Sequence, residues 1–260
     1  MLKEEEELKS NKSQNNYMSA PSSGKKMSDV LKQQADNLMK KNCFKQAVSK
    51  YLNSVMLDKN NSKTYYALGL CYKNMNKISK AIENLEKSII LEPSSPEVFF
   101  ELGLCHLKDE SPCKAIKCFI QSIQMEPDNP EVIYNLGLAH EMAQEEDMAL
   151  MIYQKLIENS PTYLNAYLRK SQLLLNMELY KQALGLYMNV LKINPKYTKI
   201  YSKIGLCFDK LGHQAYAKRF YKKFLSSEPN DEQTSFVLKR VEKLRQIKSI
   251  KTPLTLVASK

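Results

Sequence analysis

The residues best suited to bind a metal ion or to act as nucleophiles gather near the middle of the chain. Cys105, His106, Cys113 and Cys118 lie close together in the sequence. Thiolate and imidazole are ligands that zinc prefers. Known structural zinc sites use two pairs of closely spaced ligands, and these four residues do not form two such pairs. We therefore predict no metal site and expect the cysteines and histidines to serve in packing.

The sequence also lacks the motifs of catalysis and cofactor binding. It contains three histidines and seven glycines. No nucleophile elbow, phosphate-binding loop or dinucleotide fingerprint is present. Most glycines fall at spacings that suit close helix packing, so they cannot form a phosphate cradle. We predict that the protein is not an enzyme, has no catalytic residues, binds no cofactor and takes no small-molecule substrate.

The elements that carry these residues recur along the chain. Prolines are spaced 34 residues apart at Pro93, Pro127, Pro161, Pro195 and Pro229. Between two of them, residues 129–161 have the pattern of two amphipathic helices. Asn129 is a good N-cap, Pro130 is a good first helical residue, and Pro161 stops the second helix. The chain is therefore predicted to be an array of helical repeats.

Dividing the chain every 34 residues gives six units in one frame, repeats 1 to 6, at 28–61, 62–95, 96–129, 130–163, 164–197 and 198–231. Position 8 is small in each repeat: Ala35, Gly69, Gly103, Gly137, Ser171 and Gly205. Position 20 is always alanine: Ala47, Ala81, Ala115, Ala149, Ala183 and Ala217. Small residues at both positions let two antiparallel helices approach closely, where a leucine would clash.

Large residues fill the space around these small ones. Position 4 holds Leu31, Tyr65, Phe99, Ile133, Tyr167 and Tyr201, and position 24 holds Tyr51, Leu85, Phe119, Tyr153, Tyr187 and Tyr221. Together with the proline at position 32, this pattern resembles the tetratricopeptide repeat, a helix–turn–helix unit of the same period. The resemblance covers residues 28–231. It implies an all-α fold, a right-handed α-solenoid of six units.

The turn between the two helices of a repeat departs from the family pattern. This turn often carries glycine in the family, and here only Gly212 does so. The other five turns carry Asn42, Asn76, Glu110, Gln144 and Glu178. Asparagine tolerates a left-handed backbone, whereas glutamate and glutamine are less suited to it. We therefore expect a different turn geometry in repeats 3, 4 and 5.

Segments of different composition flank the repeats. Residues 1–27 are polar and charged and are predicted to form a disordered N-terminal tail. Residues 232–251 are predicted to form a capping helix that shields the last repeat from water. Residues 252–260 are expected to form a flexible tail. The apolar side of the capping helix is predicted to contain Phe236, Val237, Val241, Leu244 and Ile247.

The formal net charge of +11 is unevenly distributed. Residues 96–163 carry four lysines against twelve acidic residues, whereas residues 164–231 carry twelve basic residues against four acidic ones. An acidic centre interrupts the continuous basic face typical of nucleic-acid binders, so a nucleic-acid partner is disfavoured. No apolar run could span a bilayer and no signal peptide is evident, so we expect a cytoplasmic protein with reduced cysteines.

The resemblance further implies that the first helices line a concave groove, where the family commonly binds peptides. The residues expected to contact a partner are Tyr66, Leu70, Lys73, Phe100, Leu104, Lys108, Tyr134, Leu138, Leu168 and Leu206. Aromatic residues and leucines in a row on a solvent-facing surface indicate a binding site. The alternative is that these residues pack against neighbouring first helices, as residues in solenoids can.

The sequence therefore favours a non-catalytic scaffold or adaptor that binds a peptide or helical segment of another protein in this groove. Two alternatives stay open. One is association with nucleic acid or an anionic surface through the basic residues of the capping helix, which are Lys239, Arg240, Lys243, Arg245, Lys248 and Lys251. The other is a role as targeting subunit of an enzyme complex whose catalytic subunit is another chain. The sequence indicates neither the partner's identity nor the oligomeric state.

Overall fold

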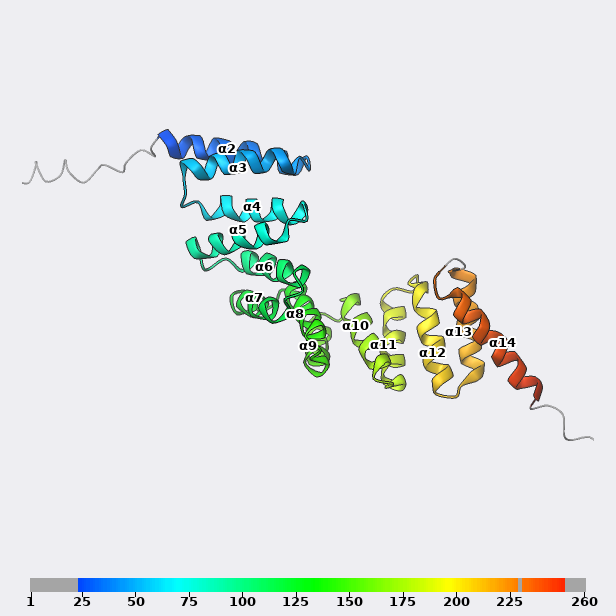
Figure 1. Ribbon diagram of the computed structural model, residues 1–260. Helices are drawn as coiled ribbons and strands as arrows, with labels where there is room; N and C mark the ends of the chain where they lie inside the picture. The colour runs from blue at the N-terminus through cyan, green and yellow to red at the C-terminus, as the bar shows by residue number, and fades with distance from the viewer. Residues whose placement is uncertain (1–22, 229–230, 251–260) are drawn as a thin grey trace, which may run out of the picture. The chain divides into compact units, whose positions relative to one another are not determined.

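The computed structural model describes residues 23–228 and 231–250, with side chains described as far as residue 245 (Figure 1). Every regular element in these residues is a helix, and most helices follow one another in antiparallel pairs. The predicted all-α fold of tandem helix pairs is therefore confirmed. The chain divides into two compact bodies, an N-terminal body, Met1–Pro127, and a C-terminal body, Asp128–Lys260.

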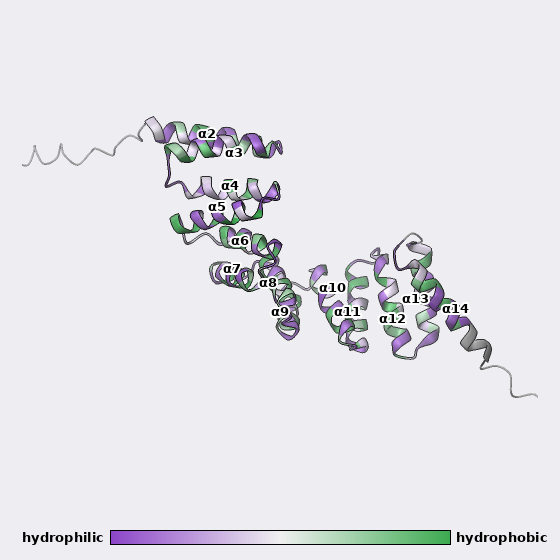
Figure 2. Ribbon diagram, viewed as in Figure 1, coloured by the Kyte–Doolittle hydropathy of each residue, from purple (hydrophilic) through white to green (hydrophobic). Residues whose placement is uncertain are grey.

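The N-terminal body contains repeats 1 to 3. Its helices are α2 (Ser23–Lys40), α3 (Phe44–Leu57), α4 (Ser62–Asn74), α5 (Ile78–Leu91), α6 (Pro96–Lys108) and α7 (Pro112–Met125). The two helices of each repeat pack against each other, and consecutive repeats are joined by packing of α3 on α4 and of α5 on α6. Figure 2 shows hydrophobic and hydrophilic residues mixed along these helices, as expected for amphipathic elements.

The C-terminal body contains repeats 4 to 6 and the capping helix. Its elements are α8 (Pro130–Met142), α9 (Glu146–Asn159), α10 (Leu164–Asn176), α11 (Tyr180–Ile193), the 3-10 turn η1 (Thr198–Ile200), α12 (Tyr201–Lys210), α13 (Gln214–Ser227) and α14 (Thr234–Ile250). Helix α9 packs on α10, α11 on α12, and α13 on α14. The Asn129 side chain caps α8 by accepting a bond from the backbone of Val132, at 3.4 Å, as predicted.

The small residues of the repeat frame lie where two helices nearly touch. All six alanines at position 20 are fully buried. A Cβ atom added to Gly103 would lie 2.5 Å from the Phe119 ring, and one added to Gly137 would lie 2.5 Å from the Tyr153 ring. The predicted close approach is confirmed.

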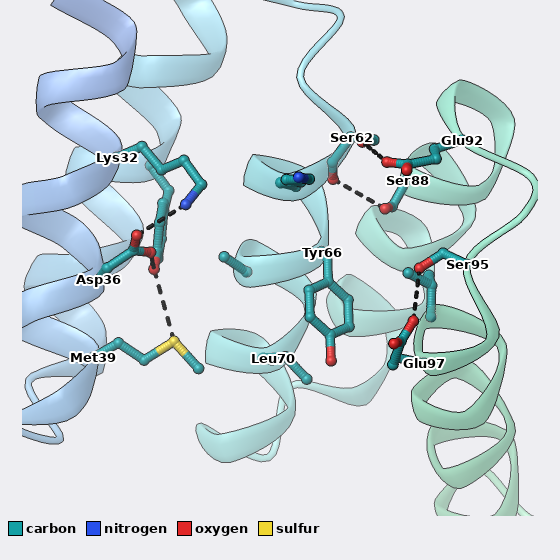
Figure 3. A pocket seen from close by; sticks show the side chains of 14 residues that line it. Lys32, Asp36, Met39, Ser62, Tyr66, Leu70, Ser88, Glu92, Ser95 and Glu97 are labelled. Atoms are coloured by element: carbon teal, nitrogen blue, oxygen red, sulfur yellow. Dashed lines mark hydrogen bonds and ion pairs between the residues drawn. The ribbon is translucent and has the colours of Figure 1, made fainter.

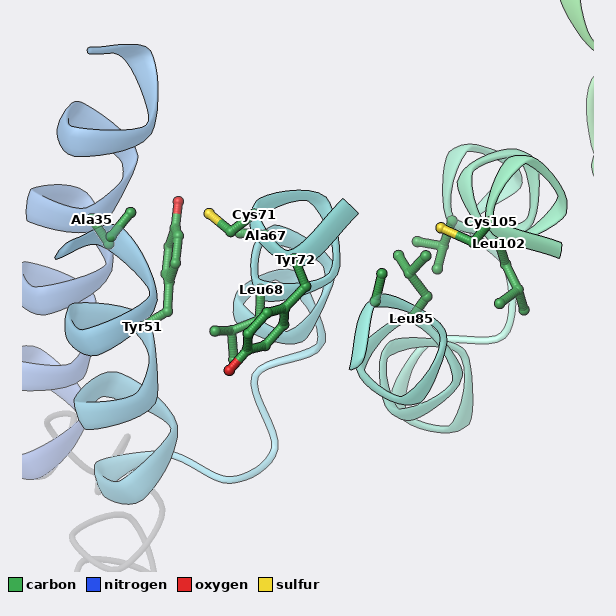
Figure 4. Close-up of a cluster of buried hydrophobic side chains, with 12 residues drawn as sticks. Ala35, Tyr51, Ala67, Leu68, Cys71, Tyr72, Leu85, Leu102 and Cys105 are labelled. Carbon is green, nitrogen blue, oxygen red and sulfur yellow. The ribbon is translucent and has the colours of Figure 1, made fainter. Parts of the chain in front are cut away.

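The large residues at position 24 fill the space between neighbouring first helices. Figure 4 shows the Tyr51 ring between Ala35 of α2 and Cys71 of α4. All three residues are fully buried. The position-24 side chain thus contacts its own repeat and the next one, so it couples consecutive repeats.

The expectation of another turn geometry in repeats 3 to 5 is wrong. The turn residue is left-handed in all six repeats, with φ of 58° at Asn42, 57° at Asn76, 54° at Glu110, 61° at Gln144, 60° at Glu178 and 81° at Gly212. The backbone N–H that follows each turn residue donates to a carbonyl five residues earlier, for example from Ser111 to His106 at 2.9 Å. This hydrogen bond offsets the cost of a left-handed backbone, about 1 kcal/mol.

The predicted disordered N-terminal tail is too long. Helix α2 begins at Ser23, so the prediction is wrong for residues 23–27. Ser28 explains the earlier start, because it is fully buried and its hydroxyl donates to the Ser54 carbonyl at 2.9 Å. Fixing Ser28 against α3 favours the helical turn that precedes it. Residues 1–22, and the predicted tail at 252–260, lie outside the described residues.

The capping helix α14 buries a narrower stripe than predicted. Val237, Val241 and Leu244 are buried against α13, but Phe236 is 54% exposed. The three buried residues follow i, i+4, i+7 spacing, and Phe236 lies about 100° around the helix from Val237. The Ile247 side chain lies outside the described residues. None of the described helices combines the length and the apolar character needed to cross a membrane.

Candidate functional site

The predicted partner-binding residues lie on the first helices of repeats 2 to 6. They form two sets, because the N-terminal body holds those of α4 and α6, and the C-terminal body holds those of α8, α10 and α12. The eight apolar members are all half-buried: Tyr66, Leu70, Phe100, Leu104, Tyr134, Leu138, Leu168 and Leu206. Each therefore packs within its own body and still presents part of its surface to solvent.

A cleft of about 480 Å³ opens in the N-terminal body between α2, α4 and α6 (Figure 3). Its apolar wall is formed by Met39 of α2, Tyr66 and Leu70 of α4, and Val98 of α6. Two predicted site residues, Tyr66 and Leu70, thus come together here, whereas Phe100 is not among the residues that line the cleft. Figure 3 shows the Tyr66 ring between the residues of α2 and those of α6.

Charged groups border the cleft. The Asp36 carboxylate accepts the Tyr51 hydroxyl at 2.5 Å and the Lys32 ammonium at 2.9 Å. Burial, and then the hydrogen bond to Asp36, raises the pKa of Tyr51. Lys63 and Glu97 line the same cleft from α4 and α6. The cleft therefore combines an apolar wall with a border of both charges.

The Tyr66 hydroxyl is available to a ligand. Among the described residues it has no hydrogen-bond partner, and the side chain is only half-buried. Burial, followed by the charges of Glu101 and Glu97, raises the pKa of Tyr66 to about 12. The phenol is therefore neutral at physiological pH and can donate one hydrogen bond to a peptide carbonyl.

Lys73 and Lys108 differ in their surroundings. The Lys73 ammonium is paired with Glu101 on the next first helix, and both side chains are less than a fifth exposed. This pair neutralises the charge of Lys73 within the N-terminal body. Lys108 is exposed and has no ion-pair partner in the described part of the chain. Of the two lysines, Lys108 is therefore the one with a free charge.

Phe100 and Tyr134 also take part in packing. The Phe100 ring centroid lies 6.1 Å from that of Phe119, and the Tyr134 centroid lies 5.6 Å from that of Tyr163. Phe119 lies on the second helix of the same repeat and Tyr163 directly precedes α10, so these contacts do not test the alternative that groove residues pack against neighbouring first helices. Because both aromatic residues stay half-buried, this packing leaves one side of each accessible.

The cleft contains residues that sequence reasoning did not select. Asp36 and Met39 occupy positions 9 and 12 of repeat 1, and Glu97 occupies position 2 of repeat 3. The family resemblance implies a groove lined by positions 2, 5, 9, 12 and 13 of each repeat, and all three residues occupy positions of this set. The row of aromatic residues and leucines begins in repeat 2, so no residue of repeat 1 was predicted to contact a partner. Asp36 and Met39 could have been predicted from the repeat frame, because the groove positions of repeat 1 adjoin those of repeat 2, which hold Tyr66 and Leu70.

Recurrent ion pairs also connect consecutive repeats. Position 12 of one repeat pairs with the following first helix in Lys73–Glu101, Glu141–Arg169 and Asp209–Arg240. In the last pair Arg240 of α14 donates twice to Asp209, once at 2.7 Å, and the Asp209 side chain is only 5% exposed. One of the basic residues predicted to contact an anionic partner is therefore already paired.

Three cysteines, with His106 and His140, are buried in the packing roles predicted for them, whereas Cys43, Cys113 and His213 are exposed. Cys71, Cys105 and Cys207 are fully buried, and burial raises the pKa of each to about 11, so these thiols stay protonated. Burial, and then Lys114, lowers the pKa of His106. Cys113 and Cys118 do have one C-x₄-C spacing on α7, but no three potential metal ligands come together in the residues described.

The fold and its surface define a class of protein, a helical-repeat scaffold with an accessible face made by first helices. Models of the tetratricopeptide repeat match residues 62–95, 131–163, 164–197 and 201–231. These matches account for about half of the chain, and the two remaining repeats have the same helix pair. The chain belongs to the tetratricopeptide-repeat family.

Solved structures share this fold at low sequence identity. The C-terminal part of a repeat-containing protein from Cytophaga hutchinsonii is 16% identical, with a TM-score of 0.70 over 81% of this chain and 87% of that one. PilW, a type IV pilus biogenesis factor, is 15% identical, with a TM-score of 0.66 over 81% and 98%. YrrB, a repeat protein with an unusual peptide-binding site, is 16% identical, with a TM-score of 0.61 over 74% and 97%. No curated protein matches the sequence.

Proposed function

We propose that this protein is a non-catalytic scaffold that binds a segment of another protein on the surface formed by its first helices. The observation that carries the proposal is the cleft of about 480 Å³ in the N-terminal body, which contains Tyr66 and Leu70. Its volume lies within the range of roughly 300–1,000 Å³ typical of ligand sites. The similar structure YrrB has a peptide-binding site, which supports a peptide as the class of ligand.

The chemistry of the cleft favours an apolar side chain on a peptide backbone. Tyr66, Leu70 and Val98 offer apolar surface, while the free Tyr66 hydroxyl can donate to a backbone carbonyl. Lys63 and Glu97 carry opposite charges, so the border of the cleft favours one orientation of a bound peptide. It does not favour a peptide of one particular net charge. The expected ligand is an extended or helical segment with an apolar anchor.

The test compares partner capture by the full chain and by two charge-inserting variants. Leu70→Arg places a cation in the cleft, and Met151→Arg places one on α9 at a side chain that is 66% exposed. We expect Leu70→Arg to remove the specifically captured partner and Met151→Arg to retain it, with unchanged helicity by circular dichroism. Phe100→Ala and Tyr134→Ala are less decisive, because each also removes a ring contact.

The proposal fails if both arginine variants capture the partner equally. It also fails if a peptide mapped from the partner binds the Leu70→Arg variant with wild-type affinity by calorimetry. Loss of capture by both variants, with helicity retained, would mean that an added arginine prevents capture wherever it is placed, so the loss with Leu70→Arg would not support the cleft.

A further inference from the structure

Three nearly parallel aromatic rings form a stack in repeat 6. The Phe220 and Phe208 centroids lie 5.6 Å apart with 21° between the ring planes, and those of Phe208 and Tyr216 lie 5.2 Å apart with 24°. Phe220 and Phe208 are half-buried, whereas Tyr216 is 56% exposed. The stack therefore runs from the interior to the surface and ends in an accessible ring.

The stack is a particular feature of this repeat. Positions 4, 11, 19 and 23 are all aromatic in repeat 6: Tyr201, Phe208, Tyr216 and Phe220. The same positions of repeat 4 hold Ile133, His140, Met148 and Ile152, and none of repeats 1 to 5 is aromatic at all four. Since the other repeats fold without such a stack, filling the core does not require an exposed tyrosine at position 19.

Basic residues share helix α13 with the exposed ring. Helix α13 carries four basic residues and no acidic one. Tyr216, Arg219 and Lys223 have i, i+3, i+7 spacing, which places them on one face of α13. The Lys223 ammonium lies 5.4 Å from the Phe220 centroid, at the inner end of the stack.

Little negative charge offsets this face. Arg219 and Lys222 are exposed and have no ion-pair partner in the structure as described. Asp209 of α12, an acidic group of the same repeat, is bound by Arg240. Lys222 follows Arg219 at i+3 and lies next to it, about 120° around the helix from Tyr216. The surface made by Tyr216, Arg219, Lys222 and Lys223, hereafter the α13 face, thus combines positive charge with an open aromatic ring.

We propose that the α13 face binds single-stranded nucleic acid. An unpaired base extends the ring stack on Tyr216, and the cations of Arg219, Lys222 and Lys223 contact the flanking phosphates. A duplex is a poorer ligand, because its bases are already stacked on each other. An anionic membrane or an acidic peptide would use the same cations but offers no base to continue the stack.

The proposal predicts a defined salt dependence. Fluorescence anisotropy of the full chain is measured with labelled oligouridylate and oligothymidylate of about 12 nucleotides. With three phosphates contacted, the slope of log K against log[salt] is expected near −2, which is a roughly 15-fold loss of affinity between 50 and 200 mM salt. Equal binding of both oligomers means that recognition uses the bases and phosphates shared by RNA and DNA. Tighter binding of one oligomer identifies RNA or DNA, respectively, as the preferred ligand.

Variants separate stacking from charge. Tyr216→Ala is expected to weaken binding by roughly 5- to 100-fold with the salt slope unchanged, since stacking is not an ionic contact. Arg219→Gln with Lys222→Gln is expected to reduce the slope to about −0.7. The matched control is Lys45→Gln with Lys117→Gln, which removes the same charge from exposed positions of α3 and α7 and should leave affinity and slope unchanged.

Three results would overturn the proposal. The first is no binding of either oligomer at 50 mM salt. The second is equal weakening by the control pair and by Arg219→Gln with Lys222→Gln, which would indicate diffuse charge attraction. The third is wild-type affinity of the Tyr216→Ala variant together with equal binding of anionic phosphatidylserine vesicles, which would identify a surface that recognises only negative charge.

Discussion

Two buried tyrosines at the same repeat position should respond in opposite ways to loss of the hydroxyl. Tyr153 and Tyr187 both occupy position 24, and each is no more than 2% exposed. The Tyr153 hydroxyl donates to Glu141 at 2.6 Å. The Tyr187 hydroxyl has no hydrogen-bond partner in the described structure, and the Ser171 hydroxyl near it donates instead to the Leu168 carbonyl.

The magnitudes follow from these surroundings. Tyr153→Phe removes a hydrogen bond to a charged group, which contributes about 1.5–3 kcal/mol, so we expect a loss near 2 kcal/mol in the free energy of unfolding. Tyr187→Phe removes a buried hydroxyl that lacks a partner, so we expect no loss and a gain of up to about 1 kcal/mol. Both substitutions remove one oxygen atom, so the change in packing cancels in the comparison.

The assay must resolve single repeats, because arrays of this kind do not always unfold in one cooperative step. Urea unfolding by circular dichroism gives the global change. Hydrogen exchange of peptides from α9 and α11, measured by mass spectrometry, locates it. A loss from Tyr187→Phe as large as that from Tyr153→Phe would refute the reasoning, since the hydroxyl of Tyr187 would then contribute as much as a hydrogen-bonded one.

Three further changes have expected outcomes. Burial raises the pKa of Tyr187 to about 12 in the folded state, so its contribution to stability is fully present below pH 10 and falls as pH rises from 10 to 12. Tyr187→Phe should remove roughly 2–3 kcal/mol of that fall, as measured by urea unfolding at each pH. Glu178→Gly should raise stability by about 0.5–1 kcal/mol by relieving a left-handed glutamate, and Gly212→Ala should lower it by a similar amount, as measured by thermal unfolding. Arg240→Ala should lower the free energy of unfolding by about 2–3 kcal/mol, because it removes the cation that pairs with the Asp209 carboxylate. The same substitution should speed hydrogen exchange in α14, and unchanged exchange would contradict this prediction.

The elements that follow a strict period could be predicted from sequence. The small residues at positions 8 and 20 and the large one at position 24 report a helix pair directly, because the close approach of two helices restricts side-chain size at those points. Gly103 and Phe119 illustrate this, since the structure leaves no room for a Cβ at Gly103. The spacing of small and large residues is therefore sufficient to predict the helix pair of each repeat.

The turns and the helix ends were less predictable. Left-handed Glu110 and Gln144 contradict residue preference, because backbone hydrogen bonds of the closed turn outweigh a local cost of about 1 kcal/mol. The start of α2 depends on a bond between Ser28 and Ser54, which are distant in sequence. Phe236 could not be placed because the rotation of α14 is set by its contacts with α13 and by the ion pair of Arg240 with Asp209, and both join α14 to repeat 6.

The candidate site was predictable only as a set of positions. Tyr66 and Leu70 follow from the repeat frame, but the cleft also needs Met39 and Val98 from two other repeats. Pairing of Lys73 with Glu101 could not be inferred from either residue alone, because it depends on how consecutive first helices face each other. Properties that arise between repeats need coordinates, whereas those within a repeat can be found in its pattern.

The most direct test of the central claim, that the first-helix surface binds a segment of another protein, is site-specific photo-crosslinking in the native cell. A photoreactive phenylalanine replaces Leu70 in the cleft or, as a control, Met151 on the exposed side of α9. We predict that the chain modified at Leu70 forms one dominant covalent adduct with another protein and that the chain modified at Met151 does not. Absence of an adduct at Leu70, or the same adduct from both positions, would contradict the proposed binding surface.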